Sequence, residues 1–267
     1  MTRAPILGST GRLGRLLRHH WPKDTQLDLI WHGRRAAATL CFDLKDTSKL
    51  SDAMTQADII LNLAGNTPAT SDDMEANIDI ANRVFSCAGE LPVITASSAA
   101  VYGERTGDCA ESDEVTPISN YGRAKLRVEQ LSTDHSGPSC AIRIGNVVGA
   151  DALFAERRSH YVLHQFADGR TPMRSFINPS LLAQVLDSLM TCMLHGGTVP
   201  SVLNIASPEP VEMSALLDAA GLEWSAEPAP SHAIARVALD TCRIQVLFDM
   251  PVDASLPQKL MRDWLNK

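Results

Sequence analysis

The stretch Gly8-Ser9-Thr10-Gly11-Arg12-Leu13-Gly14 follows the short apolar run Ala4-Pro5-Ile6-Leu7, and the leucines at positions 13, 16 and 17 then recur at helical spacing. A strand, a glycine turn and a helix in this order are the context in which a glycine motif binds a dinucleotide. Gly8 permits a tight turn, Gly11 lets the backbone approach a pyrophosphate, and Gly14 allows the helix to pack closely on the strand. The N-terminus of the helix would then face the phosphates. A glycine turn without a ligand is the alternative, and the position directly after the first strand argues against it.

The end of the second apolar run indicates which dinucleotide would bind. Leu27–Trp31 reads as a strand, and the sequence His32-Gly33-Arg34-Arg35 follows it. An acidic side chain about 20 residues beyond the glycine motif would bind the ribose 2′-hydroxyl of NAD. Arg34 and Arg35 occupy this region instead, and Arg12 lies within the glycine motif. Guanidinium groups can bind a 2′-phosphate bidentately, so NADP is the preferred cofactor and NAD the alternative. A pair of solvated surface arginines is the competing interpretation.

A second motif brings together groups that can move a proton. Tyr121 and Lys125 stand four residues apart, and Ser98 lies upstream in Thr95-Ala96-Ser97-Ser98. Residues i and i+4 share one face of a helix, so the phenol and the ammonium point into the same space. Free tyrosine has a pKa of about 10, and a nearby cation favours the phenolate. The spacing alone is typical of many solvated pairs, but together with the glycine motif it predicts proton transfer at a carbonyl beside a nicotinamide.

These motifs together resemble the extended short-chain dehydrogenase/reductase family, the NAD-dependent epimerase/dehydratase group, through nearly the whole chain. The resemblance implies an α/β fold with a doubly wound (Rossmann) parallel sheet and a small C-terminal substrate lobe. Its domains would be a cofactor-binding part at 1–149, to which 177–206 returns, and a smaller substrate-binding lobe at 150–176 and 207–267. Apolar runs that alternate with amphipathic segments agree with such a sheet.

The resemblance also assigns roles to individual residues. Tyr121 would exchange a proton with the substrate oxygen, and Ser98 would hydrogen-bond that same oxygen. Lys125 would hold the nicotinamide ribose and lower the pKa of Tyr121, and Asn77 would help to order the catalytic site. Phe42-Asp43-Leu44 is similar to the segment whose Asp contacts the adenine, and Leu61–Gly65 to the loop under the cofactor ribose. The implied cofactor-binding residues are Gly8, Thr10, Gly11, Arg12, Leu13, Gly14, Arg34, Arg35, Asp43, Leu44, Leu63, Ala64, Gly65, Tyr121 and Lys125.

Fewer sequence motifs indicate the substrate-binding residues. The implied substrate-binding residues are Ser98, Tyr121, Asn146 and Arg174. Asn146 lies in Arg143–Gly149, a stretch that resembles the start of the family's substrate site. Arg174 falls where sugar-nucleotide epimerases have an Arg that grips the substrate diphosphate, although the Asp that usually follows is replaced by Asn178-Pro-Ser-Leu181. An ordinary surface arginine is therefore the alternative.

Three functions stay open at this point. A sugar-nucleotide epimerase would retain its cofactor through the cycle, whereas an NADPH-dependent reductase of a small carbonyl would exchange it at each turnover. A redox sensor that binds NADP without catalysis ranks last, because Tyr121 and Lys125 are both present. Dehydration is disfavoured, because the family's 4,6-dehydratases have Thr-Asp-Glu where this chain has Ser98-Ala99-Ala100.

Composition indicates a compact enzyme. The chain has 267 residues, 45% of them hydrophobic, and a formal net charge of −7, which argues against a general binder of nucleic acid or of anionic membranes. Six scattered cysteines without a C-x-x-C motif indicate structural thiols in a reducing compartment, and no metal site is expected. With no leader and no apolar run that could span a bilayer, we expect a cytoplasmic enzyme of a small-molecule substrate, with a homodimer left open.

Overall fold

The computed structural model describes residues 2–34, 38–66 and 72–266, which form two compact units. The first unit comprises Met1–Gly103, Val115–Arg143 and Ala183–Leu203, and the second comprises Glu104–Glu114, Ile144–Leu182 and Asn204–Lys267. Residues 104–114, 144–149, 177–182 and 204–206, expected with the cofactor-binding part, group with the second unit. Compactness does not test which part binds a cofactor, so the functional boundaries remain a prediction.

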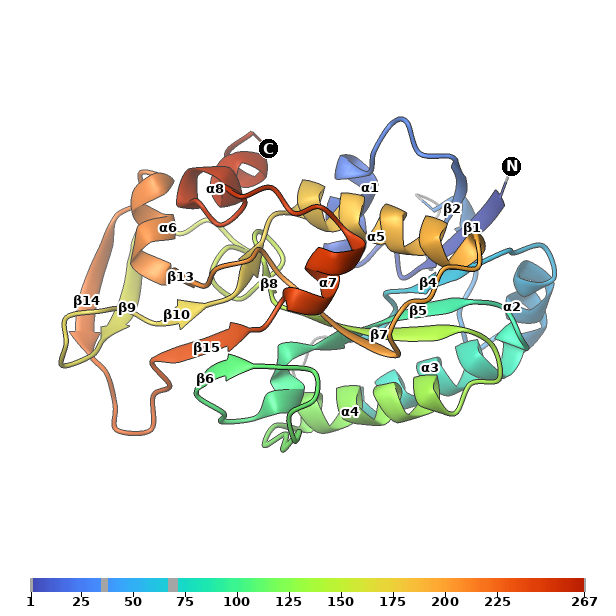
Figure 1. Cartoon of the computed structure of the whole chain (residues 1–267), viewed down its shortest axis with the longest axis horizontal. Helices are drawn as coiled ribbons and strands as arrows, with labels where there is room; N and C mark the ends of the chain where they lie inside the picture. The colour runs from blue at the N-terminus through green and yellow to red at the C-terminus, as the bar shows by residue number, and fades with distance from the viewer. Residues whose placement is uncertain (1, 35–37, 67–71, 267) are drawn as a thin grey trace. The chain divides into compact units, whose positions relative to one another are not determined.

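A seven-stranded sheet forms the centre of the first unit, with the strand order β12-β7-β5-β4-β1-β2-β3. Helices α2, α3 and α4 cover one face of this sheet, and α1 and α5 cover the other (Figure 1). This arrangement confirms the predicted doubly wound parallel sheet. The elements are β1 (Thr2–Leu7), α1 (Arg12–His20), β2 (Leu27–Gly33), β3 (Leu40–Cys41), α2 (Thr47–Met54), β4 (Ile60–Asn62), α3 (Asp72–Ala88), β5 (Val93–Ser98), the 3₁₀ helix η1 (Ala99–Tyr102), α4 (Asn120–Thr133), β7 (Ser139–Ile144), α5 (Pro179–Leu194) and β12 (Val202–Ile205).

Parallel pairing brings the segments after several strands to one edge of the sheet. β1 pairs in parallel with β2 and with β4, β2 pairs with β3, and β4 pairs with β5. The carboxyl ends of these strands therefore meet, and ligands of open α/β sheets bind at such an edge. A core of buried apolar side chains from the sheet and from α2, α3 and α4 supports the strands from one face.

Helix α4 carries Tyr121 and Lys125, and two local features fix its start. The Ser119 hydroxyl caps the helix by accepting a hydrogen bond from the Gly122 amide at 3.0 Å. A Cβ at position 122 would collide with the Ala100 carbonyl oxygen of η1. Glycine at this position therefore lets α4 pack directly against the turn that follows β5.

The second unit is built from short strands and three helices around a separate apolar core. Its four-stranded sheet has the order β13-β10-β15-β6, and β11-β8 and β14-β9 form two-stranded sheets. The elements are β6 (Gly107–Cys109), β8 (Asn146–Val147), β9 (Tyr161–Gln165), β10 (Met173–Arg174), β11 (Phe176–Ile177), β13 (Val211–Glu212), α6 (Met213–Ala219), β14 (Trp224–Pro228), β15 (Arg236–Leu239), α7 (Cys242–Leu247) and α8 (Pro257–Leu265).

Two short strands lie in segments rich in polar residues or proline. β6 lies within the polar stretch 103–120, and β14 lies within 223–232, which contains two prolines. β14 pairs in parallel with β9 in a two-stranded sheet, so Pro228 lies on an edge strand, where proline is tolerated. Among the described residues, every helix is too short or too polar to cross a membrane.

The glycine turn between β1 and α1 leaves little room at two of its glycines. Gly8 has a φ of +82°, and a Cβ there would lie 2.7 Å from the Ala64 backbone. A Cβ at Gly14 would lie 2.5 Å from Ser9 Cα and 2.6 Å from the Gly8 oxygen. At Gly11, in contrast, the nearest atom is the Gly8 oxygen at 3.2 Å, and the remaining space is open.

These spaces predict stability losses of different size for two alanine substitutions. Gly14→Ala forces backbone against backbone, so we expect it to lower the free energy of unfolding by about 1–3 kcal/mol. Gly11→Ala, the matched control, should cost less than about 1 kcal/mol, mainly because alanine is a poorer N-cap residue than glycine. Urea unfolding followed by circular dichroism measures both values. Equal losses for the two variants would contradict this account of the turn.

Candidate active site

Three segments that the sequence assigned to cofactor binding are joined by backbone contacts in the first unit. The Ser9 amide donates to the His32 carbonyl at 2.9 Å, which links the glycine turn to the end of β2. The Leu63 amide donates to the Leu7 carbonyl at 3.0 Å, which links β1 to the loop after β4. The Thr10 side chain occupies the space beside Gly33 that a Cβ would fill. The structure thus brings the predicted cofactor-binding segments to one edge of the sheet.

The end of β2 is held by a buried histidine that the sequence did not single out. The His32 ring packs on Phe42 with ring centroids 4.4 Å apart, and its Nε2 lies 3.1 Å from the Phe42 carbonyl oxygen. Burial lowers the pKa of His32, so the ring is neutral at neutral pH. This contact holds the segment of Asp43 and Leu44 beside the end of β2. Leu44 is buried, whereas Asp43 is exposed and accepts the Lys45 amide.

Of the arginines expected at the 2′-phosphate, two can be placed. Arg12 begins α1 directly after Gly11, and Arg34 follows the last residue of β2; both side chains are exposed. Arg35 lies outside the described residues. The end of β2 thus presents an arginine and no acidic side chain at positions 32–34.

Asparagine side chains hold the loop Leu63–Gly65 in place. Asn62 is buried; its Oδ1 accepts the Ala64 amide at 3.1 Å, and its Nδ2 donates to Thr95 Oγ1 at 3.2 Å. Asn77 on α3 accepts the Asn66 amide at 2.5 Å and donates to the Asn66 carbonyl at 3.0 Å. The carboxamide of Asn77 is therefore engaged by the loop backbone, and its role in catalysis remains a prediction.

The N-terminus of α1 fits a dinucleotide phosphate. No side chain caps the helix and its first turn has no acidic residue, while Gly11 at the N-cap leaves open space. Backbone amides and the helix dipole at such an end favour an anion. Gly8, Gly11 and Gly14 together with Arg12 could hold the pyrophosphate of a nicotinamide dinucleotide.

Ser98, Tyr121 and Lys125 come together at the ends of β5 and α4. The Ser98 hydroxyl interacts with the phenol of Tyr121 and lowers its pKa, and Ser98 Oγ accepts the Ala100 amide at 3.2 Å. The Lys125 side chain is buried; its Nζ donates to the Ala96 carbonyl at 2.8 Å and lies 5.8 Å from the centroid of the Tyr121 ring. A Cβ at Gly65 would lie 3.6 Å from Lys125 Nζ, so the loop after β4 reaches this group.

Burial dominates the electrostatics of this group. It raises the pKa of Tyr121 above its usual value, and the hydrogen bond from Ser98 opposes the rise. Burial lowers the pKa of Lys125 to about 8, against the opposing charge of Glu129. Lys125 was expected to lower the pKa of Tyr121. In the chain without a cofactor the pKa is raised instead, because the effect of burial is larger than that of a cation that hydrogen-bonds the Ala96 carbonyl.

A buried charge pair that was not predicted from the sequence lies behind these residues. Glu129 lies one turn beyond Lys125 on α4 and accepts two hydrogen bonds from Arg143 of β7. The Ser97 hydroxyl, beside Ser98, donates to the same carboxylate. An arginine inside the apolar strand Cys140-Ala-Ile-Arg143-Ile was the available signal, since buried charges require partners.

The two remaining predicted substrate residues belong to the second unit. Asn146 begins β8, and its Nδ2 lies 3.4 Å from the Ser175 carbonyl oxygen that it faces. Arg174 of β10 donates from Nη1 to the Met173 carbonyl and from Nη2 to the Ile234 carbonyl, both at 2.8 Å. Burial lowers the pKa of Arg174. Within the described ranges, no three His, Cys, Asp or Glu side chains gather as a metal site.

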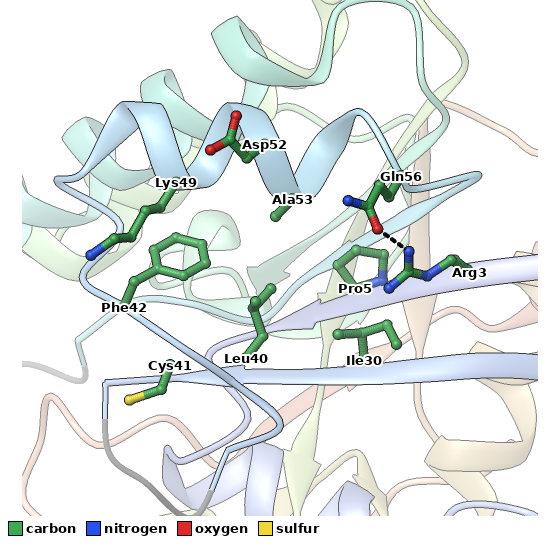
Figure 2. A pocket seen from close by; sticks show the side chains of 10 residues that line it. All are labelled: Arg3, Pro5, Ile30, Leu40, Cys41, Phe42, Lys49, Asp52, Ala53 and Gln56. Atoms are coloured by element: carbon green, nitrogen blue, oxygen red, sulfur yellow. Dashed lines mark hydrogen bonds between the residues drawn. The ribbon is translucent and has the colours of Figure 1, made fainter.

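A cavity of about 270 Å³ lies elsewhere in the first unit, between α2 and strands β1 to β3 (Figure 2). Ile30, Leu40 and Phe42 contribute apolar walls, and Arg3 at its rim hydrogen-bonds Gln56. None of the predicted catalytic residues lines this cavity, so it is separate from the Ser98–Tyr121–Lys125 group.

Solved structures share this fold along the whole chain. The UDP-Glc/GlcNAc 4-epimerase of Campylobacter jejuni matches with a TM-score of 0.81 and 17% identity, covering 100% of this chain and 99% of that one. The UDP-N-acetylglucosamine 4-epimerase of Bacillus cereus matches with a TM-score of 0.80 and 16% identity over 100% of both chains. MoeE5 in complex with UDP-glucuronic acid and NAD matches with a TM-score of 0.74 and 21% identity, covering 97% of this chain and 96% of that one.

Sequence comparisons agree with the structural ones. A curated relative, the probable low-salt glycan biosynthesis reductase Agl14 of Haloferax volcanii, is 31% identical over 121 residues, which cover 40% of this chain and 40% of the relative. The model of the NAD dependent epimerase/dehydratase family matches residues 4–184, which include the glycine turn, Ser98, Tyr121 and Lys125. The chain belongs to the NAD dependent epimerase/dehydratase family.

Proposed function

We propose that the chain is an NAD(P)-dependent oxidoreductase or epimerase that acts on a carbonyl or hydroxyl group of a sugar nucleotide or a similar small molecule. The observation that carries the proposal is the placement of Tyr121 one helical turn from the buried Lys125 ammonium, whose Nζ lies 5.8 Å from the centroid of the Tyr121 ring, with Ser98 at the end of β5. The names of similar proteins support the substrate class, since two are epimerases of UDP sugars and one was solved with UDP-glucuronic acid.

The side chains of this group suit the transfer of a proton at one oxygen. Because burial raises the pKa of Tyr121, its phenol is protonated at neutral pH and can donate to a carbonyl oxygen during reduction. Ser98 can hydrogen-bond the same oxygen and stabilise the charge that develops on it. In the oxidative direction the phenolate form of Tyr121 would take the proton; a cation near the ring, such as the Lys125 ammonium at 5.8 Å, acts in favour of that form, although burial outweighs it in the chain alone. The nicotinamide supplies or accepts the hydride.

The arginines at the end of β2 support NADP as the cofactor. Arg34 follows β2 directly and Arg12 begins α1, so two guanidinium groups flank the region where a 2′-phosphate would lie. Similar proteins were solved with NAD, which keeps NAD as the alternative.

A reductase is the second candidate, and the curated relative favours it. That relative is named a probable reductase, and NADPH is the usual donor for a reductase that exchanges its cofactor. The two candidates differ in one observable: an epimerase leaves the amount of reduced nicotinamide unchanged over many turnovers, whereas a reductase consumes NADPH in proportion to product.

Removing the phenolic hydroxyl of Tyr121 should abolish most of the turnover and leave the binding of NADPH intact. Tyr121→Phe keeps the ring, so we expect turnover of UDP-glucose, UDP-N-acetylglucosamine or the carbonyl that proves to be the substrate to fall by on the order of 10²–10⁴-fold. Binding of NADPH, followed by nicotinamide fluorescence, should persist. Tyr161→Phe, which removes a phenol from the second unit, is the control and should leave turnover unchanged. Wild-type turnover in Tyr121→Phe would refute the assignment.

Replacing the β2 arginines should change cofactor preference. Each charge-assisted hydrogen bond to a phosphate is worth roughly 1.5–3 kcal/mol, so the double variant Arg34→Ala/Arg35→Ala should weaken NADPH relative to NADH by more than about tenfold. Fluorescence titration with both cofactors measures the ratio. The adjacent exposed pair in Arg157→Ala/Arg158→Ala serves as the control. If NADPH and NADH lost affinity equally, the arginines would be surface residues and NAD would become the preferred cofactor.

A nucleotide diphosphate should protect the protein if Arg174 binds it. At about 100 times its dissociation constant, UDP would stabilise the native state by roughly 2.7 kcal/mol, which raises the melting temperature by several degrees. Arg174→Ala should abolish this shift and keep the shift that NADPH causes, and Arg170→Ala, an exposed arginine nearby in sequence, should keep both. The absence of protection by any nucleotide diphosphate, with NADPH present, would favour the reductase of a smaller carbonyl.

A further inference from the structure

Glu129 is a buried carboxylate whose hydrogen bonds all lead to the framework of the active-site group. Its Oε1 accepts Arg143 Nε at 2.9 Å and Ser97 Oγ at 2.5 Å, and its Oε2 accepts Arg143 Nη2 at 2.7 Å. Both charged side chains are only 5% exposed. The pair is therefore bidentate, which is the geometry that fixes orientation as well as distance.

Hydrogen bonds from Glu129 and Arg143 reach residues on both sides of Ser98 in the sequence. Ser97 precedes Ser98 at the end of β5. Arg143 also donates from Nη1 to the Tyr102 hydroxyl at 2.9 Å and lies 4.8 Å from the centroid of that ring, at the end of the η1 turn that follows Ser98. Ser97 thus binds the Glu129 carboxylate directly, and Tyr102 is connected to it through Arg143.

On α4 the same carboxylate lies in line with the proton-transfer residues. Tyr121, Lys125 and Glu129 are spaced i, i+4 and i+8, so they share one face of the helix. The charge of Glu129 also favours the protonated form of Lys125, whose pKa burial has lowered. One side chain therefore links β5, η1 and β7 to the helix that carries Tyr121.

Stability alone is a weak reason for such a pair. Taking two charges out of water costs about as much as their attraction returns, and apolar residues of similar volume often replace buried pairs without loss. Apolar side chains, unlike hydrogen bonds, do not fix the orientation of the groups that they contact. Catalysis requires its groups to be positioned within about 0.5 Å.

We propose that Glu129 is a positioning residue: through Arg143 and Ser97 it holds Ser98 against Tyr121, so that both hydroxyls can bond to one substrate oxygen. The inference rests on the proposed function, which assigns the proton transfer to Tyr121. Glu129 and Arg143 touch neither substrate nor cofactor in this account, and they act only through the segments that they orient.

The test separates charge balance from positioning. Glu129→Gln leaves the Arg143 guanidinium buried without its counter-ion and should destabilise the fold. The double variant Glu129→Gln/Arg143→Met removes both charges and should recover most of that stability in urea unfolding. If Glu129 acts as a positioning residue, the double variant should be impaired in catalysis even though its stability is recovered. We expect kcat to fall on the order of 10- to 10²-fold and the KM for the cofactor to stay unchanged.

A second readout requires no substrate. The titration of Tyr121 is obtained as the difference in tyrosinate absorbance between each variant and the same variant with Tyr121→Phe added. Because the hydrogen bond from Ser98 lowers the pKa of Tyr121, its loss in the double variant should move this titration upward by roughly half to one pH unit. Asp263→Asn, a buried carboxylate of the second unit, is the destabilised control and should leave the titration unmoved.

Ser97→Ala keeps the ion pair and removes only the link to β5, so it tests the proposal even if the double variant does not fold. We expect an upward shift of the Tyr121 titration in the same direction and of smaller size. An unchanged Tyr121 titration in Ser97→Ala, or in a folded double variant with wild-type kcat, would overturn the proposal. A shifted titration in an enzyme that turns over no nucleotide sugar or carbonyl would support positioning and refute the proposed function.

Discussion

Parallel strand pairing is the constraint on which the candidate site depends. Because β1, β2, β4 and β5 run in one direction, the glycine turn, the end of β2, the loop after β4 and Ser98 emerge at one edge of the sheet. Short polar contacts then set their spacing, such as the Ser9 amide on the His32 carbonyl and the Asn62 carboxamide on the Ala64 amide. Reversing one of these strands would carry its loop to the opposite edge.

Loss of water gives the group at this edge its chemical character. Burial raises the pKa of Tyr121 further above neutral pH, and it lowers the pKa of Lys125 to about 8. A phenol and an ammonium group whose proton dissociates more readily than usual thus lie on successive turns of α4. The buried Glu129 and Arg143 charges behind them are paired, so they leave no net charge against the site.

The sequence predicted the fold through features that act locally. The apolar runs predicted β1 and β2, and the glycine turn and Tyr-x-x-x-Lys spacing located α1 and α4, because period and turn chemistry are set by neighbouring residues. Contacts between distant segments were not predictable in this way. Arg143 is paired with Glu129, which lies 14 residues away in the sequence, and the Asn77 carboxamide hydrogen-bonds the Asn66 backbone, 11 residues away. The pKa of Tyr121 was misjudged because burial, a property of the folded chain, outweighs the spacing of charges.

We propose that a nicotinamide dinucleotide binds across this edge, with its pyrophosphate at the glycine turn and its nicotinamide at α4. A crystal structure of the chain with NADP⁺ bound tests it most directly. The account predicts that the ribose of the nicotinamide lies within hydrogen-bond reach, about 2.6–3.2 Å, of Lys125 Nζ. A nicotinamide turned away from α4, or a dinucleotide bound outside the glycine turn, would contradict it.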